Sequence, residues 1–124
     1  MKIDHIVLTV RNIDNTVEFY TKLLGFKKEI FGEGRYALQF DNGKINLHQY
    51  GNEFEPKAHT PMPGSEDLCF ITEEPIESFI QAMKDMDVTL LEGPIRRTGS
   101  RGPILSVYFR DPDNNLIEVS NSLY

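Results

Sequence analysis

The sequence has one cysteine, no tryptophan, few basic residues and no long apolar run. Because Cys69 is the only cysteine among 124 residues, an internal disulfide or a four-cysteine zinc site is impossible, and a reducing, cytoplasmic location is expected. The 13 basic residues face 19 acidic ones, a net charge of −6 that argues against nucleic acid or an anionic membrane as partner. No run of about 18 apolar residues is present, so no membrane span is expected.

What the chain does contain is one pattern that occurs twice. A strand is expected at residues 3–10, then a helix with Asp14 as its N-terminal cap and Gly25 at its end, then three strands at about 26–31, 35–41 and 44–50. After a loop rich in proline and glycine, the same order is expected at 67–72, from Pro75 onward, and near 88–91, 104–110 and 115–120. A pattern seen twice suggests an internal duplication.

The length suits a single α+β domain, residues 1–124. It would consist of module one at about 1–50, a linker at 51–65 and module two at about 66–121. Two βαβββ modules can place two curved sheets side by side as a cup-shaped mixed sheet with the helices outside. Residues 111–115 (DPDNN) are predicted to form the turn between the last two strands.

Polar side chains recur at equivalent positions in the two halves. Because alternate residues of a strand face opposite sides, the face away from each helix is predicted to carry His5, His48, Asp67 and Glu118. Two imidazoles and two carboxylates would suit a divalent first-row metal ion. The alternative for each residue alone is an ordinary solvated or hydrogen-bonded side chain.

Positive charge is concentrated in one place in the second half. Residues 63–124 hold 5 basic and 11 acidic residues, and three of the basic ones fall in the segment RRTGSRG. Arginine binds carboxylate or phosphate through paired N–H groups, so Arg97 and Arg101 are predicted to bind an anionic substrate. A solvated connecting loop is the alternative.

Several segments carry a resemblance to a known family. DHIVLTV followed by TVEFYTKLLGF, and YFRDPDNNLIEVSN near the end, resemble the vicinal oxygen chelate superfamily of glyoxalase I, extradiol dioxygenases and the fosfomycin and bleomycin resistance proteins. FEPKAHTPMPGSEDLCFIT and EGPIRRTGSRGPILSVYFRDPDNNLIEVSN resemble more narrowly a branch of glyoxalase-domain proteins of animals and virulence-associated bacterial ones. The resemblance implies paired βαβββ modules, a divalent metal ion (Ni, Co, Mn, Fe or Zn) and a homodimer.

The resemblance assigns roles residue by residue. The first-strand histidine of the family falls on His5 and the last-strand glutamate on Glu118, whereas Asp67 and His48 exchange the residue types of the middle pair found in glyoxalase I. It implies a metal-dependent, glyoxalase I-like lyase or isomerase that acts on a small oxygenated or thiol-conjugated anion, with Glu118 as the catalytic base. An Fe(II)-dependent dioxygenase and a protein that sequesters a small molecule are the alternatives.

Overall fold

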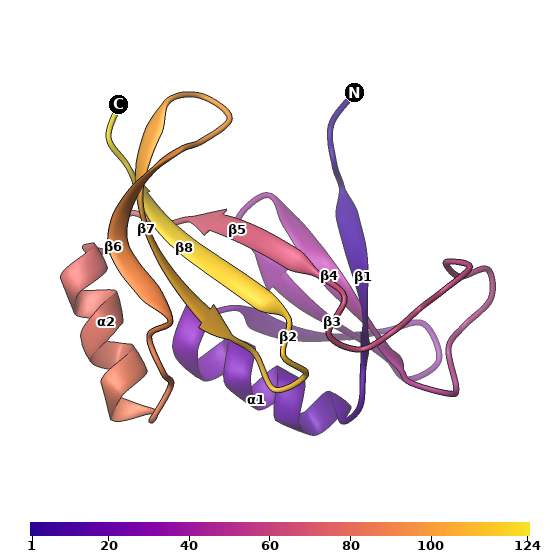
Figure 1. Cartoon of the computed structure of the whole chain (residues 1–124). Coiled ribbons are helices and arrows are strands. Elements are labelled where there is room, and N and C mark those ends of the chain that lie inside the picture. The colour runs from indigo at the N-terminus through magenta and orange to yellow at the C-terminus, as the bar shows by residue number, and fades with distance from the viewer. The chain divides into compact units, whose positions relative to one another are not determined.

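The computed structural model describes all residues, 1–124, and divides them into two compact units, Met1–Ser65 and Glu66–Tyr124. Unit 1 contains β1 (His5–Val10), α1 (Ile13–Leu24), β2 (Lys27–Phe31), β3 (Arg35–Phe40) and β4 (Gly43–Gln49). Unit 2 contains β5 (Asp67–Ile71), α2 (Ile76–Asp85), β6 (Glu92–Thr98), β7 (Pro103–Arg110) and β8 (Leu116–Ser122), as labelled in Figure 1. The α+β class and the two βαβββ modules are confirmed.

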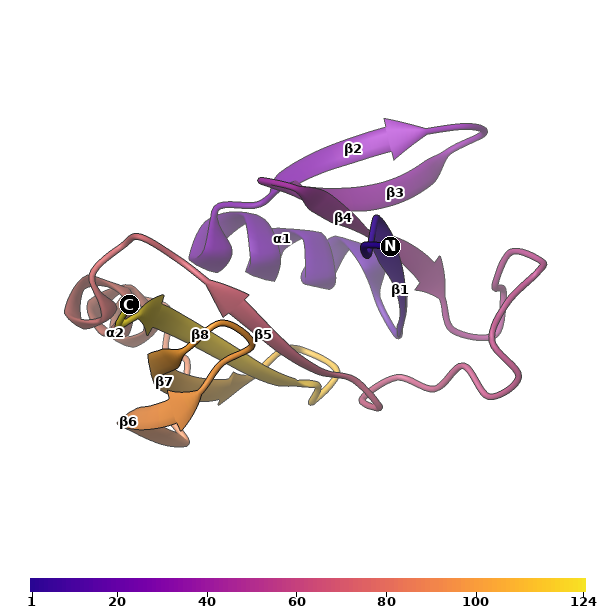
Figure 2. The ribbon, with the colours of Figure 1, turned by 90° about the horizontal axis from the view of Figure 1, so that it is seen from above.

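The two units have the same sheet topology. The strand orders are β1-β4-β3-β2 and β5-β8-β7-β6, and in each sheet the first strand pairs in parallel with the last while the other pairs are antiparallel. In unit 1, α1 lies along one face of the sheet formed by β2, β3 and β4 (Figure 2). In unit 2, α2 packs on β7. Neither helix has the length and apolar character needed to cross a bilayer.

The helices form because their apolar residues follow helical spacing. In α2 the buried residues are Ile76, Phe79 and Met83, and the Phe79 ring lies 5.7 Å from the ring of Phe109 in β7. Burying three such side chains contributes roughly 1.5–3 kcal/mol each. Gly25 ends α1 in the left-handed region at φ 72°, as the sequence predicts.

Two local predictions were wrong. The helix α1 is capped by Asn12, whose Oδ1 accepts a hydrogen bond from the Asn15 N–H at 2.9 Å, and Asp14 lies inside the first turn. The strand expected near 88–91 lies instead at Glu92–Thr98. Gly93 and Pro94 interrupt its register with β7 but do not end it, because β6 is an edge strand and proline is tolerated there.

Candidate functional site

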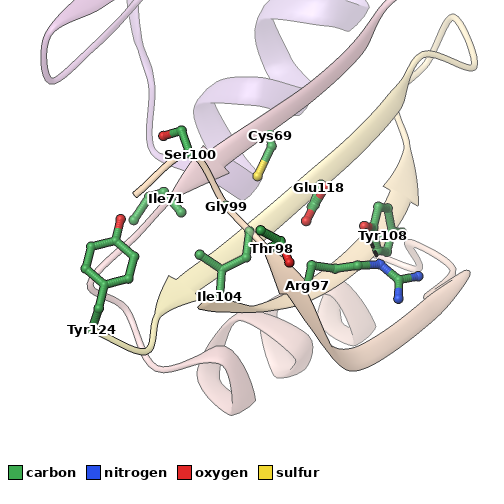
Figure 3. A pocket seen from close by; sticks show the side chains of 10 residues that line it. All are labelled: Cys69, Ile71, Arg97, Thr98, Gly99, Ser100, Ile104, Tyr108, Glu118 and Tyr124. Atoms are coloured by element: carbon green, nitrogen blue, oxygen red, sulfur yellow. Dashed lines mark hydrogen bonds between the residues drawn. The ribbon is translucent and has the colours of Figure 1, made fainter. Parts of the chain in front are cut away.

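A pocket of about 430 Å³ lies on the sheet of unit 2, on the face opposite α2 (Figure 3). Phe109 faces α2, so the alternate residue Tyr108 faces the other side, together with its register partner Glu118. The polar groups of the lining include Cys69, Arg97, Tyr108 and Glu118. Apolar side chains, Ile71 and Ile104 among them, and the ring of Tyr124 complete it.

Glu118 reaches the pocket from β8 with one of its carboxylate oxygens held. The Ser106 hydroxyl donates to Oε2 of Glu118 at 2.5 Å, and the Ser120 hydroxyl lies 3.4 Å from the same atom. Both serines are fully buried. Both serine contacts go to Oε2, and the side chains of Cys69 and Tyr108 also interact with this carboxylate.

The directions of the neighbouring hydrogen bonds follow from the number of protons available. Ser106 has one hydroxyl proton and gives it to Glu118, so in the 2.7 Å contact between the two serines Ser120 is the donor. Ser120 then accepts from the thiol of Cys69, whose Sγ is 3.5 Å away. The hydrogen bonds therefore run in one direction, from Cys69 through Ser120 and Ser106 to the carboxylate of Glu118.

Cys69 takes part in these hydrogen bonds as a protonated thiol. The residue lines the pocket, and partial burial of its side chain raises the pKa of the thiol. The nearby carboxylates of Glu118 and Asp67 act in the same direction. A thiol with a raised pKa remains protonated near neutral pH, which suits a hydrogen-bond donor and does not suit a nucleophile.

Arg97 lies in β6 at the edge of the pocket and is held by two neighbours. Its Nε donates to the hydroxyl of Tyr108 at 3.1 Å, and its Nη2 lies 3.4 Å from Oε1 of Glu92. The contact with Tyr108, and secondarily the Glu92 charge, raises the pKa of Arg97, which therefore stays charged. Partial burial raises the pKa of Tyr108, so its hydroxyl keeps its proton and can donate it.

The arginine segment, residues 96–102, is divided between a strand and a turn. Arg97 belongs to β6, and only residues 99–102 form the connection to β7. That turn is closed by a hydrogen bond from the Gly99 N–H to the carbonyl of Gly102 at 2.8 Å. Arg101 is exposed in the turn and does not line the pocket, so of the two predicted arginines the structure brings only Arg97 to the site.

In unit 1, His5 is arranged as a metal ligand would be. Its Nδ1 donates to Oδ2 of Asp4 at 2.9 Å, which leaves the lone pair of Nε2 available, and the side chain is 44% exposed. A carboxylate behind a histidine is the usual second partner of a metal-bound imidazole. The same contact lowers the pKa of Asp4.

His48 has a different environment. It is buried, and its Nε2 must accept from Nη2 of Arg35 at 3.3 Å, because a guanidinium has no acceptor atom. Burial, and then the Arg35 charge, lower the pKa of His48, so the ring is neutral. Since Nε2 is already occupied, His48 is the least suited of the four predicted ligands.

The structure brings some of these four residues near one another and separates others. His5 and His48 share a face, but His5 is opposite Lys44 while His48 is opposite Thr9, a separation of four residues, or roughly 13 Å at ~3.3 Å per residue. Asp67 is opposite Leu116 and Glu118 is opposite Cys69, so the two carboxylates are diagonal neighbours. Within neither unit do three His, Cys, Asp or Glu side chains form a metal-binding cluster, and the four-residue site stays a prediction.

Sequence reasoning missed the serines that hold Glu118 and the arginine that contacts His48. The turn at residues 111–115 contained the missing signal. This turn sets the pairing of Arg110 with Leu116. In steps of two residues outward from that pair, Tyr108 lies opposite Glu118 and Ser106 lies opposite Ser120. The two-residue turn between β3 and β4 contained a similar signal, because it pairs Phe40 with Gly43 and Tyr36 with Leu47, and the next pair outward is Arg35 and His48.

The fold and the site can now be compared with known proteins. The family model described as Glyoxalase/Bleomycin resistance protein/Dioxygenase superfamily matches residues 2–119. This chain belongs to that superfamily. The glyoxalase domain-containing protein RDO1 of Mycosarcoma maydis is 52% identical over 96% of this chain and 67% of its own length.

Two further relatives of this superfamily member are known from bacteria. Virulence protein STM3117 of Salmonella typhimurium is 52% identical over 96% of this chain and 83% of its own length. Its crystal structure has a TM-score of 0.96 and covers 99% of this chain and 98% of that one. A structure from the mobile metagenome of V. pseudocholerae has a TM-score of 0.97 at 52% identity and covers 100% of this chain and 96% of that one.

The names of three more distant matches state a reaction or a resistance function. Metallothiol transferase FosB of Staphylococcus epidermidis is 28% identical over 94% of this chain and 81% of its own length. Lactoylglutathione lyase from Agrobacterium tumefaciens and the fosfomycin resistance protein FosX from Listeria monocytogenes, the latter complexed with Mn(II), are each 19% identical, with TM-scores of 0.73 and 0.68. Both structures cover 98% of this chain, and at that identity they share its fold alone.

Proposed function

We propose that this protein is a divalent-metal-dependent, glyoxalase-like enzyme of the lyase or isomerase type. Its substrate would be a small oxygenated or thiol-conjugated anion. The observation that carries the proposal is the carboxylate of Glu118, which lines a pocket and whose Oε2 accepts a hydrogen bond from a buried serine. Members of the superfamily named as a lyase and as a metallothiol transferase support this reaction class.

The residues present fit a divalent ion in part. His5 offers Nε2 with a carboxylate behind its other nitrogen, and Glu118 offers its carboxylate at the pocket. With Asp67 these side chains give the nitrogen and oxygen donors that Ni, Co, Mn, Fe and Zn accept. The ion would supply Lewis acidity to the oxygens of the substrate. His48 would belong to the set only if Arg35 moved away from its Nε2.

The side chains of the chain itself would move the proton and hold the anion. Glu118 would take a proton from carbon and return it to the neighbouring carbon, which requires a carboxylate fixed in orientation. Arg97 would hold the anionic group at the edge of the pocket, and Tyr108 would donate its hydroxyl proton to an oxygen of the substrate. Arg101, at the tip of the turn, would serve only in capture of the anion.

The test is turnover of hemithioacetals formed from methylglyoxal and glutathione or other thiols, with each candidate metal added in turn. We expect the wild-type protein to isomerise them, Glu118→Gln to abolish the reaction, and Glu73→Gln, at an exposed position, to leave it unchanged. Oxygen consumption instead of isomerisation would identify the dioxygenase alternative. Tight binding without turnover would identify a sequestering protein, and either result would overturn the proposal.

We also propose that the enzyme works in the cytoplasm as a homodimer. The strands β1 and β5 are at the edges of their sheets, and the hydrogen-bonding groups of an edge strand are available to a second copy. Sedimentation at micromolar concentration should give twice the mass of the chain. A single monomeric species would remove this part of the proposal.

A further inference from the structure

The lining of the pocket in unit 2 is divided into a polar end and an apolar end. Arg97 marks the polar end, where its Nε donates to the hydroxyl of Tyr108. Ile104 lies on the same face of β7 as Tyr108 but four residues earlier, about 13 Å away at the rise of an extended strand. Ile71 and Tyr124 lie with Ile104 at the apolar end (Figure 3). A ligand that fills the pocket therefore meets a charged group at one end and hydrocarbon at the other.

The polar end has hydrogen-bond donors left for an anion. A guanidinium has five N–H groups, and the contacts of Arg97 with Tyr108 and Glu92 use two of them. The remaining N–H groups can bind the two oxygens of a carboxylate. A carboxylate bound there leaves the rest of the ligand to extend along the sheet toward Ile104.

The apolar end is not filled by the side chains that form it. Ile71 is 53% exposed and Tyr124 is 59% exposed, although both line the pocket. Large apolar side chains that stay exposed together mark a surface that binds another molecule. The pocket volume of about 430 Å³ falls within the range of about 300–1,000 Å³ for small-molecule sites. A ligand with an apolar part would cover both side chains and remove their hydrocarbon from water.

Tyr124 is held in place beside the pocket by its neighbours. The N–H of Leu123 donates to the carbonyl of Pro103 at 2.9 Å, which fixes the backbone next to Tyr124. The ring packs against Gly102, where a Cβ atom would lie only 2.8 Å from Cδ1 of the ring. Because Gly102 has no side chain, the ring has room at this position. The exposed ring is therefore a fixed part of the lining.

We propose that the pocket of unit 2 binds anions that carry an apolar chain or ring, and that Tyr124 selects for that apolar part. Arg97 binds the anionic group, and the chain lies across Ile104 between Ile71 and the ring of Tyr124. The inference names the substrate class of the enzyme proposed above and rests on that function. Its test measures binding in the absence of turnover, so the two proposals can fail separately.

NMR titration of the full-length protein with acetate, butanoate and hexanoate, without added metal, tests this inference. We expect the affinity to rise by roughly threefold for each added methylene, because each methylene is removed from water. Hexanoate should shift the signals of Arg97, Ile71 and Tyr124, whereas acetate should shift mainly those of Arg97. Equal affinities for acetate and hexanoate would overturn the apolar end of the site.

Substitutions separate the two ends. Tyr124→Ala should lower the ratio of hexanoate to acetate affinity by about fivefold or more, and Tyr124→Phe, which keeps the ring, should preserve it. Ile71→Ala, at an exposed position, should also lower the ratio. Arg97→Gln should weaken both ligands by about tenfold and leave their ratio unchanged, because a charge-assisted contact is lost.

The matched control is Tyr50→Ala, which removes an exposed tyrosine from unit 1 and should leave both affinities unchanged. A ratio that Tyr124→Ala does not change, or that Tyr50→Ala lowers equally, would overturn the role of Tyr124. Loss of a dimer in Tyr124→Ala would identify the apolar end as a contact between copies and would also overturn it. Chain-length-dependent binding by a protein that does not isomerise hemithioacetals would support this inference and overturn only the proposed function.

Discussion

Ser106 donates its only hydroxyl proton to Oε2 of Glu118 over 2.5 Å, from a fully buried position in the neighbouring strand. The contact joins β7 to β8 and orients the carboxylate toward the pocket. Ser120 supports it by donating to Ser106. A carboxylate fixed by buried donors does not need to be reoriented when a substrate or a metal ion arrives.

Under the proposed function, removing this donor should impair turnover without removing the proposed base. We expect Ser106→Ala to lower kcat/KM by about 10–100-fold, the usual cost of losing a group that orients a ligand or a catalytic residue. Ser120→Ala should have a smaller effect because it contacts Glu118 at 3.4 Å. Steady-state kinetics measure both, with the exposed Ser78→Ala as control. A crystal structure of Ser106→Ala with an unchanged Glu118 side chain would contradict the explanation.

The two histidines of unit 1 should differ in metal binding. His5→Ala should reduce the metal content of the purified protein, because Nε2 of His5 is free and its Nδ1 is held by Asp4. His48→Ala should leave the metal content close to that of the wild-type protein, because Nε2 of His48 already contacts Arg35. Elemental analysis of both variants decides the matter. The opposite ranking would restore His48 as a ligand.

The fold could be predicted from the sequence because its signals are local. The helical spacing of Ile76, Phe79 and Met83, the left-handed Gly25 and the turn at residues 111–115 each act over a few residues, and the structure contains all three. The misplaced strand at 88–91 shows the limit of such signals. Pro94 predicts an interruption in an isolated strand, but pairing with β7 extends the strand through it.

The site was harder to predict because it depends on contacts between strands. Strand alternation places His48 on the correct face, but it does not show that Arg35, thirteen positions earlier, reaches its Nε2. It also does not show that Ser106 and Glu118 are neighbours. Residue type and face could be predicted from the sequence, whereas the partner of each polar atom depends on register and rotamer.

Asn121 provides a test of how unit 2 is held together. The helix α2 begins after Pro75, which has no side-chain cap, and Oδ1 of Asn121 in β8 accepts from the Ile76 N–H at 2.9 Å. Its Nδ2 donates to the carbonyls of Thr72 and Glu74. We expect Asn121→Ala to lower the free energy of unfolding by about 1–3 kcal/mol. Urea unfolding measures this, and the exposed Asn52→Ala should cause almost no change.

The two predicted arginines should differ in substrate binding. Arg97→Gln should raise the KM for an anionic substrate by roughly tenfold, because its guanidinium lies at the pocket and is held by Tyr108. Arg101→Gln should change KM little at physiological ionic strength, since an exposed charge at the tip of a turn is screened by salt. Neither change should alter the metal content. Equal effects of the two substitutions would mean that long-range charge, and not contact, selects the anion.

The pH dependence of stability should depend on His48. Burial and the Arg35 charge lower its pKa below the ordinary value of about 6.5, so the unfolded chain takes up a proton at a higher pH than the folded protein does. The unfolded state then binds more protons, and the free energy of unfolding must fall as the pH drops below about 6.5 and continue to fall down to the folded pKa. The loss is complete only below that lower value.

Chemical denaturation from about pH 7.5 to about pH 5.5 measures the slope of the free energy of unfolding against pH, in a range where most carboxylates remain ionised. His48→Gln should flatten the slope, whereas His59→Gln, at an exposed position, should not. A slope that persists in His48→Gln would show that another group titrates in this range.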